Sequence, residues 1–367
     1  MQYFPHRLHL IGNYANFVTH FDFATKIRQI IHNMTQIAEN PGNTQRTPAV
    51  SILVPCYNVE KYLPQCLDSI INQTLEDIEI ICLNDGSKDG TLDIIRDYAE
   101  RDGRIVVVDK PNSGYGATMN KGLDVARGKY IGIVESDDFI EPDMFKRLYE
   151  TAEEYNLDLA RCLNTEYNEL TGKKEYSNFE SIGLYKCNEV FKPREQKYIF
   201  YIQPSIWDGL YRKTLLDDNG IRFLETPGAS FQDTSFAFKV YSVAQRVMVI
   251  REFLHNYRIN EGSSVSSTGK VFCVCEEEAE IRRFAREQGI YDDLKGVMAV
   301  RAFGCYKWNY NRLTSKYKRE FILHFSKEVR QWIADGVVNR KWFSLGRLIR
   351  LNLIAYCPRI FYFTKKI

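Results

Sequence analysis

Three carboxylates follow a short apolar run in the first half of the sequence. Glu135, Asp137 and Asp138 come directly after the run from Tyr130 to Val134, with Ser136 between the first two. We expect the run to be a buried strand, and the acids to lie at its carboxyl end, where open α/β sheets bind ligands. Crowded carboxylates repel one another unless a cation joins them, and a few hard oxygen ligands suit Mg²⁺ or Mn²⁺ shared with a phosphate-bearing substrate. Acids also favour helix N-termini, so an ordinary helix-capping turn is the alternative interpretation.

Two more polar turns follow apolar runs of the same kind. Pro55 to Glu60, with Tyr57 between them, comes after one run, and Asn84 to Gly90 comes after the next. Asp85 in the second turn can accept hydrogen bonds from N–H or hydroxyl groups of a ligand, although such a turn by itself is typical of a helix cap. Three polar turns at one edge of a sheet favour a ligand site over three separate caps.

The elements that must position these turns alternate along the chain. Apolar runs read as strands, and amphipathic helical patterns lie between them, which predicts an α/β fold with a mainly parallel sheet flanked by helices. The expected strands are 50–54, 78–83, 105–108, 130–134 and 157–162. No G-x-G-x-x-G sequence follows the first strand, so a dinucleotide-binding fold is not indicated.

Composition divides the chain further. We expect an N-terminal helical extension at 1–47, an α/β domain at 48–270 and a helical C-terminal region at 271–367. The extension carries apolar residues at helical spacing from Phe23 to Ile37, which predicts a packing helix or, alternatively, a homo-oligomer contact. The nine cysteines are odd in number and mostly lie in apolar runs, which favours reduced thiols in a cytoplasmic protein. Neither a signal peptide nor a membrane-spanning run is evident.

The C-terminal region is strongly basic although the whole chain carries a formal charge of only +2. From Arg301 onward, fifteen Lys and Arg residues face three acids, Glu320, Glu328 and Asp335. Apolar residues such as Trp342 and Leu353 are interspersed. This pattern predicts peripheral contact with an anionic membrane, with a helical cap packed on the domain as the alternative. No nucleic-acid-binding motif accompanies the charge.

The segment from Val50 to Asp138 resembles the family 2 inverting glycosyltransferases with the GT-A (Rossmann-like) fold, and the resemblance extends over roughly residues 49 to 265. It is similar to bacterial enzymes of surface-polysaccharide synthesis. The matching segments are V-P-C-Y-N-V-E (54–60), E-I-I-C-L-N-D-G-S-K-D-G-T (79–91), N-K-G-L-D-V-A-R-G (120–128) and Y-I-G-I-V-E-S-D-D (130–138).

The resemblance implies roles for individual residues. Pro55, Tyr57 and Glu60 would border the nucleotide, and Asp85 would bind the uracil of a UDP-sugar. The sequence E-S-D-D matches the D-x-D motif, with Glu135 in place of the commoner Asp. Glu135 and Asp137 would then contact the donor, and Asp137 and Asp138 would hold Mg²⁺ or Mn²⁺.

A second motif follows downstream. Asp233 lies in G-A-S-F-Q-D-T-S-F (228–236), where relatives often read E-D with the Asp as catalytic base. Gln232 replaces the Glu here, and a helix cap is the alternative interpretation. Trp207 and Asp208 are candidates for sugar contacts, with core packing as the alternative. Arg258, Ser263 and Ser264 lie where relatives have a loop near the diphosphate, and Arg258 is a candidate for contact with it, with a surface cation as the alternative.

The resemblance therefore implies metal-dependent, inverting transfer of a hexose or N-acetylhexosamine from a UDP-sugar to a saccharide or lipid-linked acceptor. One alternative is a sugar-nucleotide pyrophosphorylase-like enzyme, but the turn after the first strand lacks the glycine and basic residues of such a phosphate loop. Another is a non-catalytic nucleotide-sugar-binding module. The presence of Asp85, Asp137, Asp138 and Asp233 argues against it.

Overall fold

The structure, a computed structural model, describes residues 47–176, 186–202, 204–228, 231–259, 270–364 and 366–367. Residues 48–367 form one compact unit. The predicted N-terminal helix, as well as Ser263 and Ser264, lies outside the described residues.

Four parallel strands form one half of the sheet. They are β1 (Val50–Cys56), β2 (Ile78–Asp85), β3 (Ile105–Lys110) and β4 (Tyr130–Ile133), in the order β3-β2-β1-β4. The helices between them are α2 (Leu63–Ile71), α3 (Thr91–Arg101) and α4 (Tyr115–Val125). The register pairs Leu53 with both Ile81 and Ile133. The predicted α/β fold is confirmed, and its parallel strands lie where the apolar runs were.

The other half of the sheet is mixed instead of parallel. Beyond β4 the order continues β8 (Gly209–Arg212), β6 (Leu159–Asn168), β9 (Val247–Ile259) and β5 (Phe139–Ile140), with β7 (Lys173–Tyr176) paired to β6. Strand β8 is antiparallel to both β4 and β6, whereas β6 and β9 are parallel. This arrangement brings the downstream segments to the sheet next to the acidic turn.

Helices cover both faces of the sheet because alternate side chains of each strand point to opposite faces. Ile52 and Val54 pack in one cluster with residues of α2, α3 and α5 (Met144–Glu154). Leu53 packs in the opposite cluster with residues of α4, α8 (Gln232–Val243) and α9 (Cys273–Glu287). Shorter elements between the strands are η1 (Lys197–Tyr201) and α7 (Lys213–Asp218).

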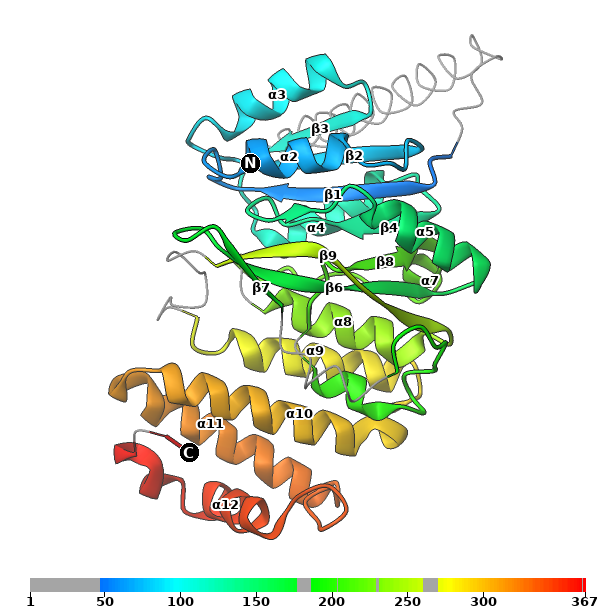
Figure 1. Cartoon of the computed structure of the whole chain (residues 1–367). Helices are drawn as coiled ribbons and strands as arrows, with labels where there is room; N and C mark the ends of the chain where they lie inside the picture. Colours follow the sequence, from blue (N-terminus) through cyan, green and yellow to red (C-terminus); the bar gives the residue numbers. More distant parts are fainter. Residues whose placement is uncertain (1–46, 177–185, 203, 229–230, 260–269, 365) are drawn as a thin grey trace, which may run out of the picture. The chain divides into compact units, whose positions relative to one another are not determined.

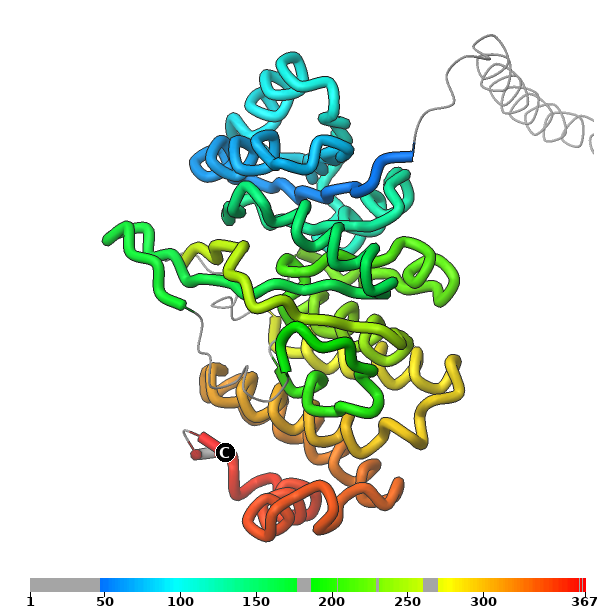
Figure 2. Tube along the Cα trace, turned by 45° about the vertical axis from the view of Figure 1, so that its right-hand side comes forward, coloured from blue at the N-terminus to red at the C-terminus, as the bar shows by residue number. Residues whose placement is uncertain are grey.

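The C-terminal helices follow one another away from β6 and β9 (Figures 1 and 2). After α9 come α10 (Tyr291–Arg312), α11 (Ser315–Ala334), α12 (Leu345–Tyr356) and η3 (Pro358–Phe363). They share a third apolar cluster that includes Phe303, Tyr306, Phe325 and Leu351. Within the described part of the chain, no helix combines the length and apolar character needed to span a membrane.

Candidate functional site

The carboxyl ends of β2, β1 and β4 lie side by side at one edge of the sheet. The three strands are parallel neighbours, with Cys56 of β1 paired to Asn84 of β2 and Leu53 paired to Ile133 of β4. The turns that begin at Tyr57, Asp85 and Glu135 therefore share one rim, as the sequence predicted. We call the turn 135–138 the acidic turn.

The turn after β1 is hydrogen-bonded to the turn after β2. The Glu60 carboxylate accepts the N–H of Gly90 at 2.6 Å, and the Glu60 N–H donates to Asp89 at 3.1 Å. Asn58 adopts a positive φ of 53°, and its side chain accepts the N–H of Lys88 at 2.8 Å. Glu60 thus fixes the shape of the rim, while the side chain of Tyr57 is 47% exposed and available to a ligand.

The Asp85 carboxylate organises the loop after β3. It is almost fully buried and accepts hydrogen bonds from Lys110 Nζ, from the N–H of Ser113 at 2.8 Å and from the N–H of Gly114 at 3.0 Å. A carboxylate offers about four lone-pair sites, so roughly one remains for a ligand. Lys110 was missed by the sequence analysis, although it ends a parallel strand at the same edge.

The same loop reaches the acidic turn and the segment before α8. The Tyr115 hydroxyl donates to Glu135 Oε1 at 2.6 Å, and the Tyr115 N–H donates to the Gly228 carbonyl at 3.1 Å. Gly114 has a φ of 90°, and a Cβ there would lie 2.9 Å from the Gly228 N. Only glycine permits this approach between the two loops.

Glu135 is half-buried beside two other acids. Burial, together with the charges of Asp137 and Asp233, raises the pKa of its carboxyl to about 8, although the hydrogen bond from Tyr115 lowers it. Negative charge is therefore crowded at this point of the rim, and a cation bound here would relieve it.

Asp137 and Asp138 have different surroundings. Asp137 is half-buried, whereas Asp138 is 1% exposed and accepts the N–H of Arg258 at 2.8 Å on Oδ1. Asp138 Oδ2 has no hydrogen bond to any residue that the structure describes and lies 3.5 Å from His255 Nε2. Burial raises the pKa of the Asp138 carboxyl and lowers the pKa of His255 to about 3. The carboxylate of Asp138 would have to leave Arg258 to reach a ligand in solvent.

Two residues support the acidic turn: Arg258 of β9, and Trp207 in the segment before β8. The Arg258 Nε donates to the Asp137 carbonyl at 2.6 Å, and its Nη2 donates to Gln65 Oε1 at 2.6 Å. Trp207 stacks on His255 with ring centroids 4.2 Å apart. Asp208 is paired with buried Arg161, its Oδ1 accepting from Nε at 2.9 Å, so its contacts belong to the core.

The donor set fits a divalent cation that shares its ligands with a substrate. No group of three or more His, Cys, Asp or Glu side chains in a metal-holding arrangement exists among the described residues. Mg²⁺ commonly uses one or two carboxylates and takes its other ligands from water and phosphate. Asp137, with Glu135 beside it, meets that requirement.

Asp233 lies in the first turn of α8, half-buried. Burial raises the pKa of its carboxyl to about 6, although hydrogen bonds with Thr234 and the charge of Arg301 lower it. The Gln232 amide donates to Thr226 Oγ1 at 2.8 Å and to the Gly228 carbonyl at 3.0 Å. The residue that replaces the usual Glu thus holds the segment before the helix.

Two charged residues near Asp233 were missed by the sequence analysis. Glu277 of α9 accepts the N–H of Ser235 at 3.3 Å, and burial, with the nearby Asp233 charge, raises the pKa of its carboxyl to about 8. Arg301 of α10 donates to Glu278 at 2.9 Å. Both come from helices more than forty residues downstream of Asp233, and no local motif marks them.

Known proteins share sequence and fold with this chain. Residues 51–216 match the family model for "Glycosyl transferase family 2". Glycosyltransferase EpsJ of Bacillus subtilis is 37% identical over 228 residues, which cover 59% of this chain and 62% of EpsJ. Glycosyltransferase GlyG of Streptococcus pneumoniae is 31% identical over 225 residues, 58% of this chain and 72% of GlyG.

Solved structures share the fold. S. aureus TarS has a TM-score of 0.66 at 21% identity, covering 86% of this chain and 54% of that chain. TarS 1–349 in complex with UDP-GlcNAc has a TM-score of 0.54 at 19% identity, covering 85% of this chain and 91% of that chain. With the GlyG match and the motifs at the rim, these findings show that the chain belongs to glycosyl transferase family 2.

Proposed function

We propose that the protein transfers a hexose or N-acetylhexosamine from a UDP-sugar to a hydroxyl of a saccharide or lipid-linked acceptor, with inversion and with the help of Mg²⁺ or Mn²⁺. The observation that carries this proposal is the gathering of Asp85, Glu135, Asp137 and Asp233 around one rim. The charge of Asp233 acts directly on Glu135 of the acidic turn, so a base and a donor site are neighbours.

Each acid has a separate task in this proposal. The remaining lone pair of Asp85 accepts the uracil N–H, while Pro55, Tyr57 and Glu60 border the nucleotide. Asp233 takes the proton of the acceptor hydroxyl as its oxygen attacks the anomeric carbon. The bond from that carbon to the diphosphate breaks at the same time, and its electron pair leaves with UDP. A single displacement from the opposite face inverts the anomeric centre.

The diphosphate needs charge stabilisation as it leaves. Asp137, with Glu135 or Asp138 as its partner, would hold the divalent cation, which would act there as a Lewis acid and template. Asp137 is the half-buried member of the Asp137–Asp138 pair, whereas Asp138 is turned toward Arg258, so we assign Asp137 the principal role.

A donor panel tests the proposal. The protein is mixed with UDP-glucose, UDP-galactose, their N-acetylated forms, and GDP- and dTDP-sugars, with Mn²⁺, Mg²⁺ or EDTA, and release of the nucleotide is measured. We expect release from a UDP-sugar that stops with EDTA. Absence of release from every donor, despite nucleotide binding, would favour a non-catalytic binding module. The pyrophosphorylase-like alternative is not favoured by the family match.

The pKa of Asp233 predicts how the rate depends on pH. A base must be ionised to accept a proton, so kcat/KM should rise about tenfold per pH unit below 6 and level off above the pKa of about 6. The measurement is initial rate against pH from 4.5 to 8 at saturating Mn²⁺. A rate that stays level from pH 4.5 to 7 would contradict the assignment of Asp233 as base.

The exposed face of α12 favours the predicted contact with a membrane surface. Leu345, Ile349, Leu353 and Tyr356 lie on that face at 60%, 56%, 38% and 64% exposure. We call these four residues the α12 stripe. Leu351 and Ile354 on the opposite face pack in the helical core. No acid lies between residues 336 and 367, so the surroundings attract anionic lipid, at about 1 kcal/mol per basic residue near the surface.

Replacing apolar residues of the α12 stripe with serine should weaken the contact with the membrane. The double variant Leu345→Ser with Ile349→Ser removes two apolar anchors, and we expect at least a roughly tenfold loss of partitioning to vesicles of phosphatidylcholine with phosphatidylglycerol. Co-sedimentation measures it. The matched control is Leu323→Ser, which alters a 43% exposed leucine on α11 and should bind like the wild type. Equal binding by all three proteins, or none by the wild type, would remove the membrane contact.

A further inference from the structure

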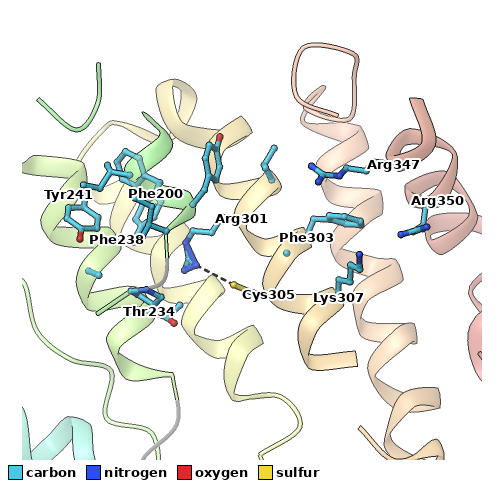
Figure 3. A pocket seen from close by; sticks show the side chains of 17 residues that line it. Phe200, Thr234, Phe238, Tyr241, Arg301, Phe303, Cys305, Lys307, Arg347 and Arg350 are labelled. Atoms are coloured by element: carbon cyan, nitrogen blue, oxygen red, sulfur yellow. Dashed lines mark hydrogen bonds between the residues drawn. The ribbon is translucent and has the colours of Figure 1, made fainter. Parts of the chain in front are cut away.

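A pocket of about 650 Å³ opens among η1, α8, α10 and α12. Figure 3 shows Phe200, Phe238 and Tyr241 on one side of it and Lys307, Arg347 and Arg350 on the other, with Arg301 between them. The rim at the ends of β1, β2 and β4 contributes none of its lining residues. We call it the α10 pocket.

The lining of the α10 pocket combines cations with aromatic and aliphatic surface. Among the described residues that line it, every charged side chain is positive and none is Asp or Glu. The cations are Arg301, Lys307, Arg347 and Arg350. Lys307, Arg347 and Arg350 make no hydrogen bond or ion pair with any other described residue. No described residue therefore offers Lys307, Arg347 or Arg350 a counter-charge, which favours an anionic ligand at this mouth of the pocket.

Arg301 lies deeper in the pocket, and only part of its hydrogen-bonding capacity is used. Its Nη1 donates to Glu278 Oε1 at 2.9 Å, and its side chain is 10% exposed. The Nη2 atom is buried and has no hydrogen-bond partner among the described residues. A buried charged donor that is left unpaired keeps the full penalty of losing its hydration. An anion in the pocket would supply the missing acceptor.

The α10 pocket adjoins the proposed base. Thr234, Ala237, Phe238 and Tyr241 form its α8 wall, and Asp233 directly precedes Thr234. The charge of Asp233 acts on Arg301 and Cys305 of the pocket as well as on Glu135 of the rim. Asp233 is thus close enough to both the donor rim and the pocket for its charge to act on each of them, and the proposed function requires the acceptor hydroxyl to arrive at this carboxylate.

We propose that the α10 pocket binds the acceptor through a phosphate group joined to an apolar or ring-shaped body. This inference rests on the proposed transferase function and adds the chemical class of its acceptor. The phosphate pairs with Arg301 and the mouth cations, and the body packs on Phe200, Phe238 and Phe303. An acceptor so held presents its hydroxyl toward Asp233. A soluble phosphate ester and a phospholipid headgroup share this chemistry.

Gly304 offers a way to fill the pocket. It lies on the pocket wall within α10, and a Cβ placed there meets no atom within 4 Å. Gly304→Leu therefore puts a side chain into open space, and replacing a glycine inside a helix favours the helix. Gly304→Ala is the matched control because it makes the same backbone change but fills little of the pocket. The double variant Arg347→Gln with Arg350→Gln removes mouth charge, with Lys316→Gln and Lys327→Gln on α11 as its control.

The test is calorimetric titration of the full chain with monodecyl phosphate below its micelle concentration, with inorganic phosphate, and with phosphatidylglycerol vesicles. We expect monodecyl phosphate to bind the wild type. It should bind Gly304→Leu and the Arg347/Arg350 variant at least about tenfold more weakly, and both control variants as tightly as the wild type. Inorganic phosphate should bind far more weakly. Equal binding by all variants, or inorganic phosphate as tight as the ester, would overturn the proposal. Vesicle binding that weakens in Gly304→Leu and in the Arg347/Arg350 variant would assign the phosphate to a phospholipid headgroup, whereas vesicle binding that these variants leave unchanged would assign it to the soluble ester.

Failure of the pocket proposal can be distinguished from failure of the proposed transferase function. If monodecyl phosphate binds as expected but no UDP-sugar releases nucleotide, the transferase function fails and the pocket remains an anion site of another kind, which overturns its assignment to an acceptor. If UDP is released but no variant alters binding of the ester, only the pocket inference fails.

Discussion

Asp233→Asn should lower the rate of sugar transfer by about 10² to 10⁴, the usual contribution of a general base. The amide keeps the size of the carboxylate but cannot take the proton of the acceptor hydroxyl. Binding of UDP should stay within about twofold of the wild type, because the nucleotide contacts are assigned to Asp85 and the acidic turn. Initial rates at pH 7.5 and calorimetric titration with UDP measure the two effects.

The matched control is Asp218→Asn, which makes the same chemical change at an exposed position at the end of α7. It should transfer sugar at the wild-type rate. Loss of UDP binding together with transfer in Asp233→Asn would mean that Asp233 supports the site structurally. A rate near that of the wild type would require another base, and the candidate is Glu277 of α9, a buried acid with a pKa of about 8 on which the Asp233 charge acts.

Asp137→Asn should abolish the effect of Mn²⁺ on UDP binding and reduce transfer by at least about a hundredfold. The neutral amide is a much weaker ligand for a hard cation than a carboxylate, and the leaving diphosphate loses the charge that offsets its own. The measurement is UDP affinity with Mn²⁺ and with EDTA. In the wild type we expect Mn²⁺ to strengthen binding; in the variant the two values should agree.

Asp93→Asn on α3 is the control for the loss of a carboxylate. The Asp93 side chain is 89% exposed, and the residue is distant in sequence from the acidic turn. Asp138→Asn tests the second predicted ligand. If Mn²⁺ still strengthens UDP binding to Asp137→Asn but not to Asp138→Asn, the assignment is reversed and Asp138 must leave Arg258 when the donor binds.

The parallel half of the fold could be predicted from the sequence because its information is local. Each apolar run is long enough to define a buried strand, and helices at regular spacing force right-handed crossovers, so the ends of β1, β2 and β4 had to share an edge. The mixed half of the sheet has less local information in its sequence. Strand β8 has four residues, and its pairing with β4 depends on contacts between Tyr130 and Arg212, eighty residues apart.

The candidate site followed the same division. Asp85 and Asp233 could be named because each lies in a motif that resembles those of family 2 glycosyltransferases; the turn or helix start beside each of them, taken alone, favours a cap. Lys110, Tyr115 and Glu277 were not, since their roles arise from contacts with distant carboxylates and carry no local signal. Similarly, adjacent residues in one acidic run gave no sign that Asp138 turns inward to Arg258.

The contact between Gly114 and Gly228 limits how this protein can diverge. The two loops are more than a hundred residues apart in the chain, yet a Cβ at Gly114 would collide with the Gly228 backbone, and the Tyr115 N–H is bonded to the Gly228 carbonyl. Neither loop can change its path alone. A chimaera that imports the loop after β3 from a relative must import the segment before α8 with it, so the proposed nucleotide side and the proposed base side of the site are inherited as one module.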